Sequence, residues 1–197
     1  MSAPETAVSG VAPAGVQWRT CTARIVELAA HRGRERELES IAADRGWSLP
    51  PLGQAVITSS QLSLSVRPGR WLLLTAPETS GAGVAMWEPG LDGLGSTVDL
   101  SASVVPLQLG GTAALEVLAR SCRLDLHPQH FATGRAAATI MAQVATIIVA
   151  LPRGLLILTP ASTARHFGEW LEATARPFGL TPPSNVGLSA LLGRDGT

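Results

Sequence analysis

The sequence predicts an α+β domain in which helices cover one face of mostly antiparallel sheets. Two pairs of strand-like runs are each joined by a short turn rich in proline and glycine, residues 62–67 with 70–76 and residues 137–150 with 155–159. Segments with the spacing of amphipathic helices lie between and after these pairs. Hairpins joined by helices are typical of this class, because antiparallel pairs need only a tight turn whereas parallel pairs need a long crossover.

The N-terminal half begins with a predicted strand and a short helix. Residues 20–30 contain the apolar and β-branched side chains that favour a strand. Residues 33–45 are highly charged, but Leu38, Ile41 and Ala42 fall at i, i+3 and i+4. These three side chains form one apolar stripe, so the segment is predicted to be an amphipathic helix.

A hairpin is predicted next. Residues 62–67 alternate apolar and polar side chains, which is the period-two pattern of a half-buried strand. The turn dipeptide Pro68-Gly69 joins them to the apolar residues 70–76, which predict a buried strand. Residues 79–87 are expected to form a further helix, followed by a loop rich in proline and glycine.

The C-terminal half continues the alternation of strands and helices. Residues 97–109 predict one strand, and a helix over residues 113–121 is expected to bury Leu115, Leu118 and Cys122.

The end of the domain is predicted to be a second hairpin and a last helix. Residues 137–150 are interpreted as one long apolar strand, which a Pro-Arg-Gly turn leads back into residues 155–159. A final helix is predicted from Pro160 to about residue 176, because proline suits the first turn of a helix. Its apolar residues, among them Phe167, fall on one face.

The two halves share an approximate β-α-β-β-α order, which is compatible with a ferredoxin-like arrangement used twice. Residues 1–18 are predicted to be a disordered tail, and residues 19–180 a single α+β domain. Residues 181–197 are rich in proline, serine and glycine and are predicted to be a flexible C-terminal tail.

The composition excludes several classes of function. The net charge is zero, so no bulk field draws the chain to nucleic acid or to anionic lipid. All 15 basic residues are arginine, and there is no tyrosine. The chain therefore has no Schiff-base lysine, P-loop lysine or catalytic tyrosine. Hydrophobic residues make up 46% and charged residues 15%, which hints that a partner covers part of the surface.

The sequence predicts a soluble, cytoplasmic protein. Residues 136–151 are the one candidate membrane segment, but they are too short for a spanning helix and contain polar side chains. Residues 1–17 lack the basic region and apolar run of a signal peptide. Cys21 and Cys122 do not form a C-x-x-C pair, so we expect two buried free thiols.

The chain lacks the motifs of nucleotide binding and of common catalytic sites. A G-x-G-x-x-G turn is not present, since Met86 stands where the third glycine would follow Gly81 and Gly83. A Walker A loop, a nucleophile elbow and an H-E-x-x-H helix are also missing from the sequence. We therefore predict no catalytic and no cofactor-binding residue in this chain.

One cluster of residues invites a metal hypothesis. Cys122, Asp125, His127 and His130 are all metal-ligand types and fall within nine residues. However, the histidines are spaced H-x-x-H with Pro128 between them, and Cys122 is expected on the buried face of a helix. Because closed zinc sites constrain the spacing of their ligands, a structural loop is favoured and no metal site is predicted.

Four segments stand out in this order along the chain: RPGRWLLL (67–74), VDLS (98–101), LQLGGTAALEVLARSCRLDLHPQHFATG (107–134) and ASTARHFGEWLEATARPFGL (161–180). On these segments, the stretch from Pro68 to Leu180 resembles the gamma subunit of heterotetrameric sarcosine oxidase. The recognisable core of the family is a helix of small residues followed by a cysteine and a short polar and aromatic motif, here Cys122, Asp125, Leu126, His127, Phe131 and Gly134.

The resemblance implies a fold, a complex and partners. The gamma subunit looks like a shortened relative of the folate-binding domain of aminomethyltransferases, which is an α+β fold. Its partners would be the alpha, beta and delta subunits of a flavoenzyme that oxidatively demethylates sarcosine. The resemblance places FAD, FMN, NAD, zinc and the co-substrate tetrahydrofolate in those partners, and no cofactor in this chain.

The resemblance also implies a role in assembly rather than in chemistry. We expect Arg120, Asp125, His127 and Phe131 to shape a surface that docks on another subunit. Two other readings stay open: the gamma subunit of a related N-methyl amine dehydrogenase or demethylase, and a free-standing folate-binding protein.

Overall fold

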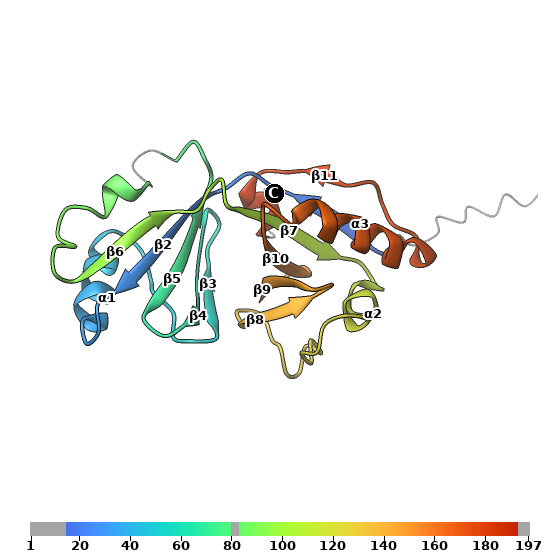
Figure 1. Cartoon of the computed structure of the whole chain (residues 1–197), viewed down its shortest axis with the longest axis horizontal. Helices are drawn as coiled ribbons and strands as arrows, with labels where there is room; N and C mark the ends of the chain where they lie inside the picture. The colour runs from blue at the N-terminus through green and yellow to red at the C-terminus, as the bar shows by residue number, and fades with distance from the viewer. Residues whose placement is uncertain (1–14, 80–82, 193–197) are drawn as a thin grey trace, which may run out of the picture.

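The structure is a computed structural model that describes residues 15–79 and 83–192. It contains two β-sheets that lie side by side, with helices on their outer faces (Figure 1). The strands and helices are named below as in the figure.

The first sheet has five strands in the order β3-β4-β5-β2-β6, and every neighbouring pair is antiparallel. The strands are β2 (Arg24–Ala30), β3 (Gln54–Ile57), β4 (Gln61–Arg67), β5 (Arg70–Thr75) and β6 (Gly95–Asp99).

The second sheet has six strands in the order β11-β1-β7-β10-β9-β8. Only the pair β1–β11 is parallel. The strands are β1 (Gln17–Thr20), β7 (Val104–Gly110), β8 (Ala136–Met141), β9 (Val144–Ala150), β10 (Leu155–Pro160) and β11 (Ser184–Asn185).

The helices divide the apolar interior into three layers. One core lies between the two sheets, and α4 (Leu188–Leu191) closes it. A second core lies between the five-stranded sheet and α1 (Glu35–Asp44) with the 3₁₀ turn η1 (Val84–Met86). The third lies between the six-stranded sheet and two helices, α2 (Ala114–Ala119) and α3 (Ala164–Ala175), and the 3₁₀ turn η2 (Arg176–Phe178) packs beside it.

The chain is an internal repeat in which the two units exchange one strand. Each unit consists of a strand, a second strand, a helix and a three-stranded meander, β1 to β5 in the first and β6 to β10 in the second. The first strand of each unit joins the other unit's sheet, because β1 pairs with β7 while β6 pairs with β2. The connection from β1 to β2 crosses the connection from β6 to β7. At this crossing the N–H of Cys21 donates to the carbonyl of Pro106, and the N–H of Leu100 donates to the carbonyl of Ile25.

The structure confirms the α+β class, both predicted hairpins and the helix near residues 33–45. Leu38 and Ala42 of α1 are fully buried on its apolar stripe. The repeat of the halves is also present, and each half contains the split β-α-β unit of a ferredoxin-like arrangement. The strands β2 and β4 run in the same direction on either side of β5, with α1 between them in the sequence. The strands β7 and β9 do the same on either side of β10, with α2 between them in the sequence.

Several boundaries predicted from the sequence are wrong. Residues 137–150 form two strands, β8 and β9, because the backbone reverses at Ala142 and Gln143, both at positive φ. Residues 97–109 are split between β6 and β7, which belong to different sheets. The strand of residues 62–67 is buried on both faces rather than one. Leu62 and Leu64 pack in the core between the sheets, while Ser63 on the other face is buried and donates its hydroxyl to the carbonyl of Ser48 in the loop after α1.

The helices also differ from the prediction in detail. The last helix starts at Ala164, and Pro160 ends β10 instead. The segment of residues 79–87 contains only the short turn η1, and residues 80–82 lie outside the described residues. Leu115 on α2 is 38% exposed, whereas Leu118 and Cys122 are buried as predicted.

Both predicted tails are partly folded. Val16 has no exposed surface and precedes β1, so the domain begins before residue 19. Beyond residue 180 the chain forms β11 and α4, and Leu188, Leu191 and Leu192 are buried between the sheets. Residues 1–14 and 193–197 lie outside the described residues.

Two further observations concern the interior and the length of the helices. Cys21 and Cys122 are free and buried, and burial raises the pKa of the Cys21 thiol to about 12. Among residues 15–79 and 83–192, no helix is long and apolar enough to cross a membrane.

Replacing Thr146 with valine is expected to stabilise the chain. Thr146 is 3% exposed, and its hydroxyl has no hydrogen-bond partner within the described residues. Its neighbours Val144 and Ile148 on β9 face the core under α2 and α3, so strand alternation turns Thr146 to that side. Valine has the same shape without the unpaired polar group, whose burial costs about 1–3 kcal/mol. Urea unfolding measures the expected increase in the free energy of unfolding.

The matched control is Thr112→Val, which changes an exposed threonine and should shift the free energy of unfolding by less than about 0.5 kcal/mol. A Thr146→Val chain less stable than wild type would show that the hydroxyl has a stabilising partner.

Candidate docking surface

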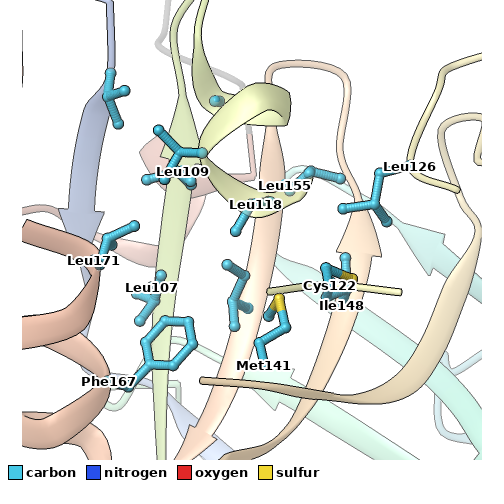
Figure 2. Packing of buried hydrophobic residues seen from close by; sticks show 14 of the residues in the cluster. Leu107, Leu109, Leu118, Cys122, Leu126, Met141, Ile148, Leu155, Phe167 and Leu171 are labelled. Atoms are coloured by element: carbon cyan, nitrogen blue, oxygen red, sulfur yellow. The ribbon is translucent and has the colours of Figure 1, made fainter. Parts of the chain in front are cut away.

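The loop of residues 120–134 connects α2 to β8 and contains every residue that the sequence analysis assigned to a docking surface. Two apolar side chains anchor it, since Leu126 is 7% exposed and Phe131 is 9% exposed. Both belong to the core between the six-stranded sheet and its helices, where Figure 2 shows Leu126 and Cys122 among the packed side chains. The anchors hold the polar residues of the loop at the surface.

Asp125 organises the exposed part of this loop. Its Oδ1 accepts a hydrogen bond of 2.9 Å from the backbone N–H of His127, and its Oδ2 contacts Nδ1 of His130. The carbonyl of His127 accepts the N–H groups of His130 and Phe131, both at 2.8 Å. The two imidazole rings lie 6.2 Å apart. The result is a compact polar turn with its carboxylate and imidazoles turned to solvent.

Arg120 lies at the start of the loop and is tied to two neighbouring elements. Its guanidinium stands 5.0 Å from the centre of the Phe178 ring, which follows α3, and 3.9 Å from a carboxylate oxygen of Glu116 on α2. Half of the side chain stays exposed. A guanidinium held over an aromatic face keeps its free N–H groups available for an acceptor on another chain.

The four predicted docking residues thus fall into two groups. Arg120, Asp125 and His127 are exposed on one continuous segment, while Phe131 lies beneath it. Phe131 can shape the surface only by supporting the loop from the core. The sequence alone did not separate the exposed residues from the buried one, because they lie close together in the same short segment.

The loop does not bring the candidate metal ligands together. Cys122 is buried in the core, whereas the side chains of Asp125 and His130 are 60% and 66% exposed. In the part of the chain that the structure describes, no group of three or more His, Cys, Asp or Glu is placed to hold a metal ion. The donor set therefore does not fit a zinc site.

Asp125 should make stability depend on pH. The backbone N–H of His127 and then the His130 side chain hold the pKa of this carboxyl below its usual value. A lowered folded pKa stabilises the chain above the unfolded pKa of about 3.9, and the contribution is lost as pH falls through the folded pKa. Wild type should exceed Asp125→Asn in urea midpoint at pH 6, and the difference should shrink as the pH falls through the folded pKa of Asp125.

The control is Asp92→Asn, which changes an exposed carboxylate on a different loop. A gap between wild type and Asp125→Asn that stays constant from pH 6 to below pH 3 would mean that the charge of Asp125 is not involved.

The fold of the chain is also found in an aminomethyltransferase. It superimposes on the glycine cleavage system aminomethyltransferase T from Bartonella henselae with a TM-score of 0.62 and 18% identity, over 91% of this chain and 51% of that chain. At this identity the match shows the fold alone.

The chain belongs to the family described as "Sarcosine oxidase, gamma subunit family", whose sequence profile matches residues 40–176. That region includes the whole loop from Arg120 to Gly134 and both of its supporting helices. The family resemblance drawn from the sequence is confirmed.

Individual relatives agree with this assignment. The chain is 40% identical over 78 residues to the sarcosine oxidase subunit gamma of Corynebacterium sp. (strain U-96), covering 39% of this chain and 38% of that protein. It is 37% identical over 112 residues to that of Arthrobacter sp, covering 55% and 54%. The matches therefore span from 38% to 54% of these relatives' length.

A solved structure extends the similarity over most of the fold. A chain of the heterotetrameric sarcosine oxidase from Corynebacterium sp. U-96, in complex with pyrrole 2-carboxylate, superimposes with a TM-score of 0.74. The two chains share 29% identity, and the match covers 85% of this chain and 87% of that chain.

Proposed function

We propose that this chain is the gamma subunit of a heterotetrameric sarcosine oxidase and acts in assembly rather than in chemistry. The complex would demethylate sarcosine to glycine in the cytoplasm, with formaldehyde or methylene-tetrahydrofolate and hydrogen peroxide as the other products. It would be an oxidoreductase acting on CH–NH donors. The observation that carries the proposal is the match over 85% of this chain to a chain of a heterotetrameric sarcosine oxidase.

The arrangement of the surface supports an assembly role. The polar turn around Asp125 is ordered by its own hydrogen bonds and presents a carboxylate, two imidazoles and Arg120 to solvent. Such preorganised groups lose little conformational entropy when they dock on another chain. The surplus of apolar over charged residues in the sequence is consistent with a surface covered by alpha, beta or delta subunits.

The flavins of the complex, FAD and FMN, would reside in the partner subunits, as would NAD, zinc and tetrahydrofolate. In the described part of this chain the residue types that could ligate zinc do not converge. Its contribution would be to bind and stabilise the assembled state, since any partner that binds only the folded chain raises its stability by mass action.

Co-purification tests this proposal. The tagged chain is co-expressed with the genes that neighbour its own and recovered by affinity. We expect a yellow complex with larger subunits that consumes oxygen when sarcosine is added. A colourless chain that is recovered alone and binds tetrahydrofolate would contradict the proposal and favour a free-standing folate-binding protein. A yellow complex that oxidises another N-methyl amine but not sarcosine would identify the related dehydrogenase or demethylase instead.

A further inference from the structure

The two sheets are joined at one corner and separate beyond it. At the corner, Ala136 of β8 donates its N–H to the carbonyl of Gly53 at 3.0 Å, and Ala55 of β3 donates to Gly134 at 2.7 Å. Along β4, the pairing with β3 ends at Ser65 opposite Gln54. Beyond Ser65, β3 no longer lies between β4 and β8.

The free edge of β8 begins at the same place. Ala136 directs its N–H away from β9, and these groups alternate in direction along a strand. The N–H and C=O groups of Ala138 and Ile140 therefore point to the outer edge of the six-stranded sheet (Figure 1). Within the described residues, neither N–H donates to a backbone carbonyl.

This edge carries none of the usual protection against pairing. Exposed edge strands are commonly blocked by lysine, proline or inward-pointing charges. The sequence of β8 is Ala-Ala-Ala-Thr-Ile-Met, which has no charge and no proline, and Ile140 is 65% exposed. An open and apolar edge of this kind is a template for a further strand.

A cavity of about 250 Å³ lies beside this edge, between the two sheets. Its walls are mostly apolar and come from β4, β5, β8, β9 and β10, with Leu64, Ala138, Ile147 and Leu158 among them. An apolar cavity of roughly 150 Å³ holds a benzene molecule, so this one has room for a large apolar side chain.

The rim of the cavity is positively charged. Arg67 and Arg70 line it together with Glu27, and Arg70 pairs with Glu27 at 2.6 Å. The pair leaves one positive charge, that of Arg67, uncompensated among these three residues. An acidic residue on an incoming segment would complement it.

We propose that the free edge of β8 and the adjoining cavity form a strand-addition site for an extended segment of another subunit. The proposal rests on the proposed function, since that function supplies the partner. The segment would pair with Ala138 and Ile140, place one large apolar side chain in the cavity and carry an acidic residue near Arg67. Main-chain pairing gives affinity in this mode of recognition, and the pocket gives specificity.

A second copy of this chain fits the site less well. Pairing two copies of β8 would bring a second Arg67 and Arg70 toward a cavity rim that already carries both. Like charges placed together oppose association. An acidic and apolar segment of a partner would cause no such repulsion between like charges.

Two variants of the edge test the site in the full chain, co-expressed with its partner subunits. Ala138→Pro removes one outward N–H, which an edge strand tolerates, and Ile140→Asp places a charge on the exposed apolar position. Each should lower the recovery of partner subunits by about tenfold or more, while thermal unfolding of the purified chain stays within a few degrees of wild type. The matched controls are Thr97→Pro and Val98→Asp on β6, the edge strand of the other sheet, where Val98 is 50% exposed. These should leave recovery unchanged.

The outcomes separate this inference from the proposed function. If the wild-type chain recovers no partner, the proposed function fails. If wild type and both edge variants recover partners equally, only the strand-addition site is overturned. A photo-crosslinking residue at position 140 should join the chain to one partner subunit in the assembled complex. A crosslink to a second copy, or none in a complex that has formed, would also overturn the site.

Discussion

A Phe167→Ala chain should unfold with a free energy about 3–5 kcal/mol below that of wild type, which makes this one of the most damaging single changes. Phe167 is fully buried on α3 and faces the six-stranded sheet next to Leu107 and Leu171 (Figure 2). Its ring also packs against Trp170, with the ring centres 5.5 Å apart. Truncation removes buried apolar area and leaves a cavity that a closely packed interior cannot fully close.

This change should also affect the loop of the candidate docking surface. Phe167 and the loop anchors Leu126 and Phe131 belong to the same core. Leu115→Ala on α2 is the control, because that side chain is 38% exposed and should cost less than about 1 kcal/mol. Urea unfolding measures both, and equal losses in the two variants would show that α3 does not seal this core.

A Trp87→Ala chain should lose a similar amount, about 3–5 kcal/mol, on the opposite side of the molecule. Trp87 is fully buried between η1 and the five-stranded sheet, with its ring 6.4 Å from that of Trp47. The guanidinium of Arg45 lies 5.5 Å from the centre of the same ring. The ring therefore joins η1 to the C-terminal end of α1, and its loss removes contacts with both.

The control for this prediction is Trp87→Phe. The indole N–H of Trp87 is buried and has no hydrogen-bond partner among the described residues, so phenylalanine keeps an aromatic ring and removes an unpaired polar group. We expect Trp87→Phe to retain most of the stability that Trp87→Ala loses. If both variants lose the same amount, the ring contacts with Trp47 and Arg45 are not what stabilises this corner.

The sequence was sufficient for elements whose signal is local. The stripe of Leu38 and Ala42 on α1 and the Pro68-Gly69 hairpin each depend on residues a few positions apart. The turn between β8 and β9 was missed for the same reason. Ala142-Gln143 is not a turn signature, yet both residues adopt the left-handed region because the strands on either side pair with each other.

Features that depend on distant parts of the chain were not predictable. Trp47, Trp71 and Trp87 are far apart in the sequence, but the five-stranded sheet brings them into one core. The exchange of β1 and β6 between the units has no local signal at all, since it depends on which sheet each strand joins. Burial of α4 was hidden by the polar and proline-rich residues before it.

The candidate site shows the same contrast. Asp125, His127 and His130 are close in sequence, so their grouping in one turn could be expected. The open edge of β8 could not be expected from the sequence. Its residues lie inside a continuous apolar run, and such a run indicates a buried strand equally well. Only the sheet order shows that Ala138 and Ile140 lie at an edge.

The most direct test of an assembly role is the turnover number of complexes that carry changes in the loop. Asp125→Ala and His127→Ala chains would be co-expressed with the partner subunits, and the intact complex isolated by size. Oxygen uptake with saturating sarcosine is then measured per assembled complex, alongside the yield of complex. We predict a lower yield with an unchanged turnover number, because the proposed role of these side chains is to contact a partner and not the substrate. A normal yield with turnover lost would contradict the account and place the loop in the chemistry of the enzyme.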